Sequence, residues 1–289
     1  MELETMYTEY KPLLISIAYR MLGSLSDAED MVQDVFVSMQ RVQTETVDNV
    51  KAYLVKMTTN RCLNELSSSH KRREVYTGPW LPEPDIRENG DNPEERIVLE
   101  ESVSYALLVL MQQFAPLERA VFLLKEVLGY SYKEIAATVD KSEANCRKIY
   151  SRVLPKINPQ TPPPAEPGNK ETVVRSFMQA SRTGDFAPFI QLLTDEAVLT
   201  SDGGGKRRAA IFPIFGRERI RAFLEGLHKK AAMEDELRPV DINGEPGLLL
   251  YRDGHLHKAV CFGNDPRQPG IQAVYFILNP DKLTRAPQA

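Results

Sequence analysis

The chain has 289 residues. Because a single hydrophobic core seldom serves a chain of this length, two or three domains are expected. Apolar residues make up 42% and charged residues 26%, a composition typical of a globular protein in water. No apolar run approaches the roughly 20 residues of a membrane span, and the acidic start Met1-Glu2-Leu3-Glu4 is unlike a basic signal peptide. These features argue against a membrane protein and predict a cytoplasmic one.

The net charge of −4 conceals two strongly basic stretches. Lys56–Arg73 contains five basic residues against Glu65 alone, and Lys141–Lys156 contains five against Glu143 alone. Basic islands in an acidic chain suit a protein that binds phosphates at chosen places, although solvated surface is the commoner reason for such clusters.

The cysteines Cys62, Cys146 and Cys261 are far apart and form no CxxC pair. This spacing argues against a disulfide framework and against a structural zinc site. We expect small buried thiols, no metal and no cofactor.

Residues 3–43 carry apolar side chains at helical spacing, interrupted at Gly23. Ser26, with Glu29 three residues later, predicts an N-cap and capping box at the start of the second helix. Another amphipathic stretch, which predicts a third helix, covers 47–66.

A linker is predicted from about 78 to 92, where periodicity is lost among prolines, glycines and acidic residues. Helical pattern then returns over 93–157. Breaks are predicted at Pro116, Gly129 and Pro155. The following segment, 158–168, is dense in proline and predicts an extended, semi-rigid spacer.

Beyond the spacer the pattern becomes a mixture of helices and strands. Helices are predicted at about 170–182, 186–193 and 216–231. Strands are predicted at about 196–202, 236–242, 247–251, 255–262 and 271–278. The predicted fold class is therefore multi-domain, with two all-α parts followed by an α+β domain.

The sharpest motif of the first half is a pair of short helices within 130–152, with a turn at Asp140-Lys141 and Ser142 as the cap of the second helix. The residues of the second helix predicted to face the core are Cys146, Tyr150 and Val153. The residues left facing outward are Asn145, Arg147, Lys148, Ser151 and Arg152. A helix-turn-helix inserts such a polar, basic helix into the major groove, but periodicity alone fits an ordinary helical hairpin equally well.

Tyr132–Ala137 and the basic helix after it resemble region 4 of extracytoplasmic-function sigma factors, which binds the −35 promoter element. Asp27–Phe36 closely resembles their region 2.2, whose acidic and polar face docks on the largest subunit of RNA polymerase. The resemblance implies polymerase binding by Asp27, Glu29, Asp30, Gln33, Asp34 and, on the buried side of the helix, Phe36.

Tyr53–Asn64 is similar to the next segment of the family, which captures the strand-separated −10 element. Capture requires a polar pocket for a flipped base and cations along a single-stranded backbone. Asn60 and Asn64 lie one helical turn apart and can offer amides to a base edge. The residues expected to hold phosphates are Lys56, Arg61, Lys71, Arg72 and Arg73. Region 2, linker and region 4 occur in the family order, which makes the resemblance specific.

Three further motifs resemble the signatures of one sigma subgroup that carries a fused SnoaL-like domain, a cone of curved sheet with helices. They are Trp80-Leu81-Pro82-Glu83-Pro84, Asp202-Gly203-Gly204-Gly205-Lys206 and Asn279-Pro280-Asp281-Lys282-Leu283. The resemblance implies that the appended domain tunes activity without a separate anti-sigma factor, and that the first two motifs meet. Trp80, flanked by prolines, would be a stiff knob for a pocket; a tryptophan that merely fills a domain seam is the plainer alternative.

Region 4 departs from the family pattern in two places. It ends at Arg152–Ile157 without the further arginines of many relatives, and Ile149 stands where a basic residue is common. We therefore expect a weaker or more sequence-selective grip on DNA.

Other functions are open for the C-terminal domain. SnoaL-like cones elsewhere are cyclases and isomerases, and His255 and His257 with Asp253 or Asp241 could form a catalytic or metal cluster, although no third ligand has convincing spacing. A cavity in the cone could hold an unknown small-molecule ligand. A DNA-binding regulator that works without polymerase is a further alternative, against which the region 2.2-like helix argues.

The sequence thus predicts a transcription initiation factor, not an enzyme, that binds core RNA polymerase, the double-stranded −35 element and the single-stranded −10 element. The C-terminal domain is expected to modulate it in cis by restraining the spacing of the sigma domains. The predicted domains are 1–75 (region 2), 76–95 (linker), 96–158 (region 4), 159–168 (spacer) and 169–289 (SnoaL-like regulatory domain).

Overall fold

The computed structural model describes residues 3–42, 47–73, 76–87, 103–157, 168–230, 236–264 and 270–287. These residues form two compact units. The helical unit contains the described residues up to 73 and from 108 to 157, and the sheet unit contains 76–87, 103–107 and the described residues from 168 onward. The predicted combination of all-α and α+β parts is confirmed. Nearly all of the predicted spacer, 159–168, lies outside the described residues.

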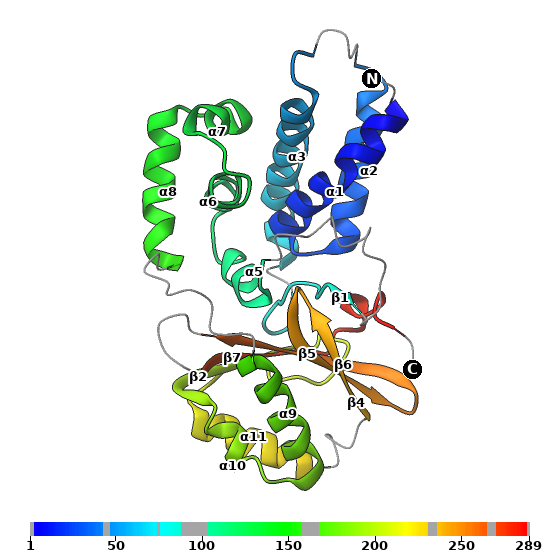
Figure 1. Cartoon of the computed structure of the whole chain (residues 1–289), viewed down its shortest axis with the longest axis vertical. Coiled ribbons are helices and arrows are strands. Elements are labelled where there is room, and N and C mark those ends of the chain that lie inside the picture. The colour runs from blue at the N-terminus through cyan, green and yellow to red at the C-terminus, as the bar shows by residue number, and fades with distance from the viewer. Residues whose placement is uncertain are drawn as a thin grey trace. The chain divides into compact units, whose positions relative to one another are not determined.

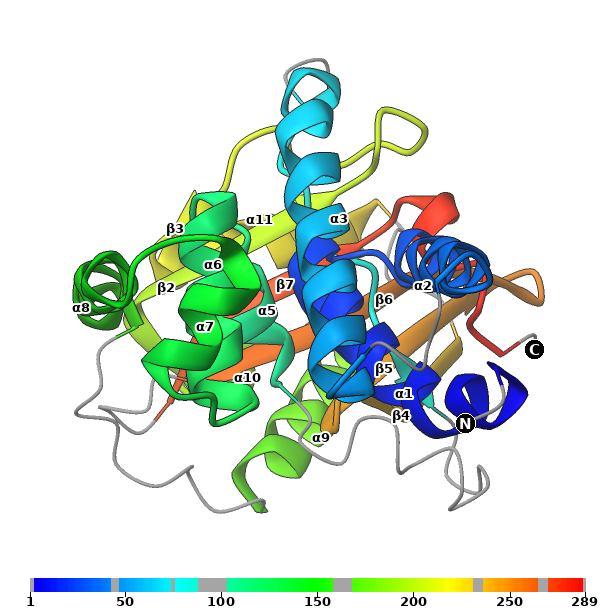
Figure 2. The ribbon, with the colours of Figure 1, turned by 90° about the horizontal axis from the view of Figure 1, so that it is seen from above.

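The helical unit places one long helix between two groups of helices. Its described elements are α1 (Leu3–Leu22), α2 (Leu25–Met39), α3 (Val50–Arg73), α5 (Tyr105–Met111, from Leu108 onward), α6 (Pro116–Phe122), the π-helical turn η3 (Leu123–Val127), α7 (Tyr132–Val139) and α8 (Glu143–Ile157). The views in Figures 1 and 2 agree that α3 lies between the α1–α2 pair and the α6–α7 group, and α3 packs against all four.

The start of α2 differs from the prediction. Gly23, with a φ of 75°, follows the last residue of α1. Ser24 is extended and its Oγ accepts a hydrogen bond from the Asp27 backbone N–H at 3.2 Å, so Ser24 is the N-cap. The prediction that Ser26 caps this helix was wrong, because Ser26 already lies inside the first turn.

The predicted break at Pro155 was also wrong, since α8 continues through it to Ile157. Proline removes one backbone donor, but two residues from a helix end this affects only the last turn. The other two predicted breaks do lie at helix ends. Pro116 is the first residue of α6, and Gly129, with a φ of 64°, follows η3.

The sheet unit is built on one mixed sheet whose strand order in the described residues is β1-β4-β5-β6-β7-β2-β3. The strands are β1 (Ile86–Arg87), β2 (Leu193–Asp202), β3 (Ile214–Phe215), β4 (Glu236–Ile242), β5 (Glu245–Arg252), β6 (His255–Asn264) and β7 (Ile271–Ile277). All neighbours are antiparallel except β2 and β7. A short 3-10 turn, η4 (Pro280–Lys282), follows β7.

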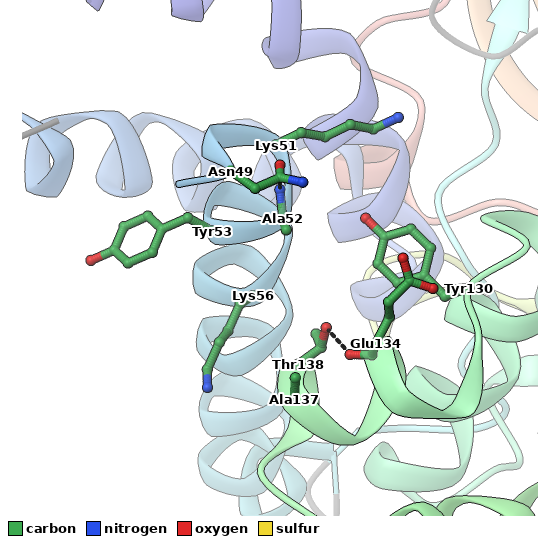
Figure 3. Close-up of a pocket in the computed structure, with 9 residues that line it drawn as sticks. All are labelled: Asn49, Lys51, Ala52, Tyr53, Lys56, Tyr130, Glu134, Ala137 and Thr138. Atoms are coloured by element: carbon green, nitrogen blue, oxygen red, sulfur yellow. Dashed lines mark hydrogen bonds between the residues drawn. The ribbon is translucent and has the colours of Figure 1, made fainter. Parts of the chain in front are cut away.

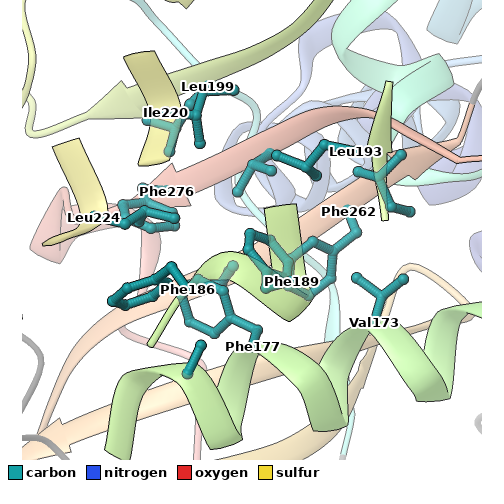
Figure 4. Packing of buried hydrophobic residues seen from close by; sticks show 14 of the residues in the cluster. Val173, Phe177, Phe186, Phe189, Leu193, Leu199, Ile220, Leu224, Phe262 and Phe276 are labelled. Carbon is teal, nitrogen blue, oxygen red and sulfur yellow. The ribbon is translucent and has the colours of Figure 1, made fainter. Parts of the chain in front are cut away.

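Three helices cover one face of this sheet: α9 (Gly168–Thr183), α10 (Ala187–Ile190) and α11 (Arg217–Lys229). Alternate residues of the strands, such as Val260 and Phe262, face them. The Phe177 ring lies edge-on to four phenylalanine rings, with centroid distances from 5.1 to 6.4 Å. Figure 4 shows these aromatic side chains filling the space between helices and sheet.

The sequence pattern predicted the three helices and the five longer strands of this unit, but it placed the second helix too far along the chain. The segment at 186–193 ends its helix at Ile190, and β2 already begins at Leu193. The two-residue strands β1 and β3 were not predicted, because an alternating pattern needs more than two residues to be visible.

Candidate nucleic-acid interface and linker-binding site

The helices α7 and α8 form a helix-turn-helix whose ends are set by local capping. Ser131 caps α7 reciprocally with Glu134, whose carboxylate accepts from the Ser131 N–H at 2.7 Å. Asp140 ends α7 in the left-handed conformation, with a φ of 51°. Ser142 Oγ then accepts from the Asn145 N–H at 3.2 Å, as predicted for the cap of α8.

The buried side of α8 is formed by Cys146, Ile149 and Val153. The sequence prediction placed Tyr150 on this side, but Tyr150 is half-buried and donates its hydroxyl to Glu126. Ile149 takes the core position instead. The apolar residue at 149 is therefore a packing residue, and it removes no cation from the outward face.

The outward face of α8 carries the predicted −35 residues. Arg147, Lys148, Ser151 and Arg152 are exposed and Asn145 is half-buried. The Arg147 guanidinium lies 4.4 Å from the centroid of the Tyr132 ring and 3.4 Å from Glu143 Oε2. Stacking on one face leaves the edge of the guanidinium able to donate to DNA.

The predicted polymerase-binding residues occupy one helix, α2, on two different faces. Asp27, Asp30, Gln33 and Asp34 are exposed and Glu29 is half-buried. Phe36 is only 5% exposed, and its ring lies edge-on to that of Tyr7 with a centroid distance of 4.9 Å. Phe36 therefore packs on the buried side of α2, opposite the acidic face. Sequence reasoning missed Val37, which is 54% exposed beside the acidic face. Because valine is apolar, there was no reason to expect its side chain on the exposed side of the helix.

The predicted −10 residues extend along α3. Asn64 is exposed and Asn60 half-buried. Lys56 Nζ lies 2.6 Å from Asp140 Oδ1, and Arg61 donates to Ser38 Oγ at 2.5 Å with Asp34 Oδ2 at 3.9 Å. The last turn of α3 carries Lys71, Arg72 and Arg73, whose side chains lie outside the described residues.

In the sheet unit, three motifs distant in sequence converge on one carboxylate. Asp202, fully buried at the end of β2, accepts four hydrogen bonds. Oδ1 accepts from the Tyr76 hydroxyl at 2.6 Å and the Gly204 N–H at 2.9 Å. Oδ2 accepts from the Leu81 N–H at 2.9 Å and from Lys282 Nζ at 2.6 Å. Burial, and then the bond to this carboxylate, raises the pKa of the Tyr76 hydroxyl.

The Lys282 ammonium completes this site by joining the C-terminal motif to the linker. It also donates to the Leu81 carbonyl. It lies 4.1 Å from the centroid of the Trp80 ring and 5.2 Å from that of Tyr76. The charge is thus satisfied by a carboxylate, a carbonyl and two aromatic faces, as a nearly buried lysine requires.

The glycine loop must approach the C-terminal motif closely. Gly204 has a φ of 61°, and a Cβ there would lie 2.4 Å from Asn279 Nδ2. Asn279 uses that amide to donate to the Tyr76 hydroxyl at 2.9 Å, and its Oδ1 accepts from the Asp281 N–H. On the surface of the loop, Lys206 and Asp281 form an exposed ion pair at 2.6 Å.

The rest of the linker also lies on the sheet unit. The backbone of Ile86–Arg87 pairs with β4 as the edge strand β1, and Asp85 and Asn243 exchange two hydrogen bonds at 2.8 and 3.1 Å. The buried Glu83 faces Arg285 at 3.5 Å. The segment predicted as an irregular linker is therefore an ordered part of the sheet unit from 76 to 87.

Tyr105, at the start of α5, is held by the same unit. Its hydroxyl donates to the Pro82 carbonyl at 2.8 Å, and its ring lies edge-on to Tyr275 at 5.4 Å. Sequence reasoning missed Tyr76, Tyr105 and Asn243. Tyr76 lies close to the prolines of the linker, which was a signal for it, but nothing in the sequence relates Tyr105 or Asn243 to that segment.

The residues considered as a catalytic or metal cluster have other contacts. Arg207 Nη1 lies 2.6 Å from His257 Nδ1 and also donates to the His257 carbonyl. Asp241 accepts from the Gly244 N–H, and Asp253 occupies a left-handed turn with a φ of 52°. His255 is exposed. Within the described residues, no group of three His, Cys, Asp or Glu side chains has the geometry to hold a metal.

All three cysteines are buried and free, as predicted. Burial raises the pKa of the Cys62 thiol to about 12 and raises that of Cys261 well above its ordinary value. No helix in the described part of the chain has the length and apolar character needed to span a bilayer.

Comparison with known families finds two matches. Residues 6–73 match the family Sigma-70 region 2, and residues 104–157 match the family Sigma-70, region 4. The first match runs from the first turn of α1 to the end of α3, and the second covers α5 to α8.

Comparison with individual proteins extends the similarity to the whole chain. The ECF RNA polymerase sigma factor SigJ of Mycobacterium tuberculosis is 30% identical over 288 residues, which covers 95% of this chain and 91% of that protein. The ECF RNA polymerase sigma factor SigG of the same species is 26% identical over 280 residues, 86% of this chain and 73% of that protein. The crystal structure of SigJ has the same fold, with a TM-score of 0.79 and 24% identity over 99% of this chain and 100% of that one.

Sigma factors bind core RNA polymerase and promoter DNA and act in transcription initiation, so the helix-turn-helix and the acidic helix α2 are parts of a transcription factor rather than of an enzyme. With an N-terminal region 2, a region 4 and an α+β domain in the order of SigJ, the chain belongs to the extracytoplasmic-function family of RNA polymerase sigma factors.

Proposed function

We propose that three helices of this sigma factor have separate roles in transcription initiation. The acidic face of α2 docks on core polymerase, α3 captures the melted −10 strand, and α8 reads the −35 major groove. The exposure of Asp30 and Asp34 on α2, of Asn64 on α3 and of Arg147 on α8 supports this division. Phe36 contributes by packing beneath α2, since its side chain is buried.

We further propose that the sheet unit regulates the two sigma modules, region 2 (α1–α3) and region 4 (α5–α8), in cis by holding the linker between them. The observation that carries this proposal is the convergence of Tyr76, Leu81 and Lys282 on the buried Asp202 carboxylate. A tether fixed along part of its length spans less distance than a free one, and the distance between two binding modules sets whether both engage one partner. Release of the linker would therefore favour simultaneous engagement of the −10 and −35 elements.

In this scheme the regulatory surface is part of the same chain, so no separate anti-sigma factor is required to hold the sigma modules. The aromatic packing around Phe177 occupies the space between the helices and the sheet in the described part of the unit. That packing supports regulation through the linker contact more than regulation through a small molecule bound inside the cone.

The test is run-off transcription with core polymerase and full-length protein. Asp202→Asn removes the charge that Lys282 pairs with, and we expect it to raise transcription by releasing the linker. Asp281→Asn is the matched control, because it removes a carboxylate from the same loop contact at a position whose side chain is 61% exposed. Equal output from both variants and the unaltered protein would remove the claim that the linker contact restrains the factor.

A further inference from the structure

The two sigma modules, region 2 (α1–α3) and region 4 (α5–α8), meet in the helical unit where α3 packs against α7 and α6, and where α1 packs against α6 and η3. Lys56, in the second turn of α3, forms an ion pair at 2.6 Å with Asp140, the left-handed residue between α7 and α8. Each module thus gives one charged residue to the same contact. The Asp140 carboxylate occupies the ammonium that strand capture needs for a backbone phosphate.

Beside this ion pair, the α3–α7 contact is open and not tightly packed. A cleft of about 440 Å³ separates the start of α3 from α7. Its lining residues are Asn49, Lys51, Ala52, Tyr53, Lys56, Tyr130, Glu134, Ala137 and Thr138. Figure 3 shows the small side chains of Ala137 and Thr138 where α7 lies next to α3, with Tyr130 on one side of α3 and Tyr53 directed to the other.

A second polar contact joins the modules. Arg119 of α6 is buried and donates to the Met21 carbonyl in the last turn of α1, where carbonyls have no helical partner. It also donates to Gln112 Oε1 at 2.8 Å and to the Gln112 carbonyl at 3.1 Å, both within its own module. The two bonds to Gln112 lie within its own module and can persist on separation, while the Met21 carbonyl can accept from water instead.

We propose that the α3–α7 contact is a closed state of the two modules in which α7 covers the start of α3 and Asp140 holds Lys56, so that closure and strand capture through Lys56 exclude each other. This inference rests on the proposed role of α3. The side chains of Lys56 and Asp140 are 41% and 69% exposed, so their ion pair is weak and a phosphate or salt can displace the carboxylate.

The experiment measures closure and DNA binding separately in the full-length chain. Thr138, buried in α7 at the edge of the cleft, is replaced by cysteine, and its rate of reaction with a small thiol reagent reports opening. The native cysteines are buried and give the background. The rate is compared with and without Asp140→Asn, in which asparagine keeps the left-handed backbone. Asp48→Asn is the control, because it removes an exposed carboxylate close to the start of α3 without touching the ion pair.

We expect Asp140→Asn to raise the labelling rate roughly two- to fivefold, the effect of losing an exposed ion pair, and Asp48→Asn to leave it unchanged. A short single-stranded oligonucleotide of mixed sequence, followed by fluorescence anisotropy, should raise the rate further as it binds. An unchanged rate with Asp140→Asn overturns the closed state, and an oligonucleotide that binds without changing the rate overturns the exclusion. If no variant binds the oligonucleotide, the proposed strand capture by α3 fails, while the Asp140→Asn rates still decide whether closure exists.

Discussion

Replacing Asp202 by asparagine tests the linker-binding site at the carboxylate that accepts its four converging hydrogen bonds. The side chain keeps its size and its position at the end of β2, but it loses its charge and one oxygen becomes an amide nitrogen. Both oxygens accept hydrogen bonds in the native protein, from Tyr76 and Gly204 on one side and from Leu81 and Lys282 on the other. Whichever way the new amide turns, a donor faces a donor.

The cost follows from the burial of both charges. Asp202 is fully buried and the Lys282 side chain is 10% exposed. Removing one partner of a buried ion pair costs about 3–5 kcal/mol, because the other charge stays buried without compensation. Lys282 keeps the Leu81 carbonyl and the faces of Trp80 and Tyr76, and a cation on an aromatic face gains roughly 0.5–2 kcal/mol. We therefore expect Asp202→Asn to destabilise the docked linker by about 2–4 kcal/mol.

Trp80 makes this loss directly measurable, because it is the single tryptophan of the chain and lies in the linker itself. Asp202→Asn should shift the Trp80 emission to longer wavelength and increase its quenching by acrylamide at denaturant concentrations where circular dichroism shows the helices intact. Lys282→Met combined with Asp202→Asn should restore part of the docking, since it removes the buried ammonium left without its carboxylate, while the asparagine amide still faces a backbone N–H. A Trp80 signal identical in Asp202→Asn and the unaltered protein would refute the assignment of Asp202 as the centre of the site.

Gly204→Ala should weaken linker docking by about 1–3 kcal/mol, because it strains a positive φ and forces the Asn279 amide away, whereas Gly205→Ala, with its nearest neighbour at 3.4 Å, should cost less; Trp80 quenching compares the two. Arg147→Ala should weaken binding to −35 duplex DNA by roughly 1–3 kcal/mol in an anisotropy titration if Arg147 contacts a base, and an equal loss on every sequence would indicate a phosphate contact. Asn64→Ala should reduce promoter melting, read by permanganate footprinting, more than it reduces association with polymerase. Equal losses of melting and association would contradict base capture by Asn64.

Local sequence patterns predicted those parts of the fold that local physics determines. Ser142 was identified as a cap because its hydroxyl needs only an N–H three residues away. Cys146 and Val153 were placed in the core because helical periodicity puts them on one face. The same reasoning failed for Tyr150, whose polar hydroxyl finds Glu126 at the surface while Ile149 enters the core. Periodicity within one turn cannot separate neighbouring positions when both are apolar in character.

The linker-binding site shows where such reasoning ends. Asp202 and Leu81 are 121 residues apart, and Tyr76 and Asn279 are 203 apart, so no local pattern relates them. Resemblance to a family placed Trp80, Asp202 and Lys282 in three separate sequence motifs. That they converge on a single carboxylate depends on β2 and β7 lying side by side in parallel, a pairing between strands far apart in the chain. Tyr76 and Tyr105 lay outside every signature and became visible only through their contacts.

The two ion pairs Lys56–Asp140 and Asp202–Lys282 differ in burial, and we therefore assign them different roles. The Lys56–Asp140 pair is exposed, so its contribution is small and ionic strength or a phosphate can compete with it. The Asp202–Lys282 pair is buried and shared with the linker backbone, so no competition from solvent reaches it and its loss is expensive. Closure of α7 on α3 would then respond quickly to promoter DNA, whereas release of the linker would need a partner with binding energy of its own, for which core polymerase is the natural source. Raising the salt concentration should therefore open the α3–α7 cleft while the Trp80 signal stays unchanged.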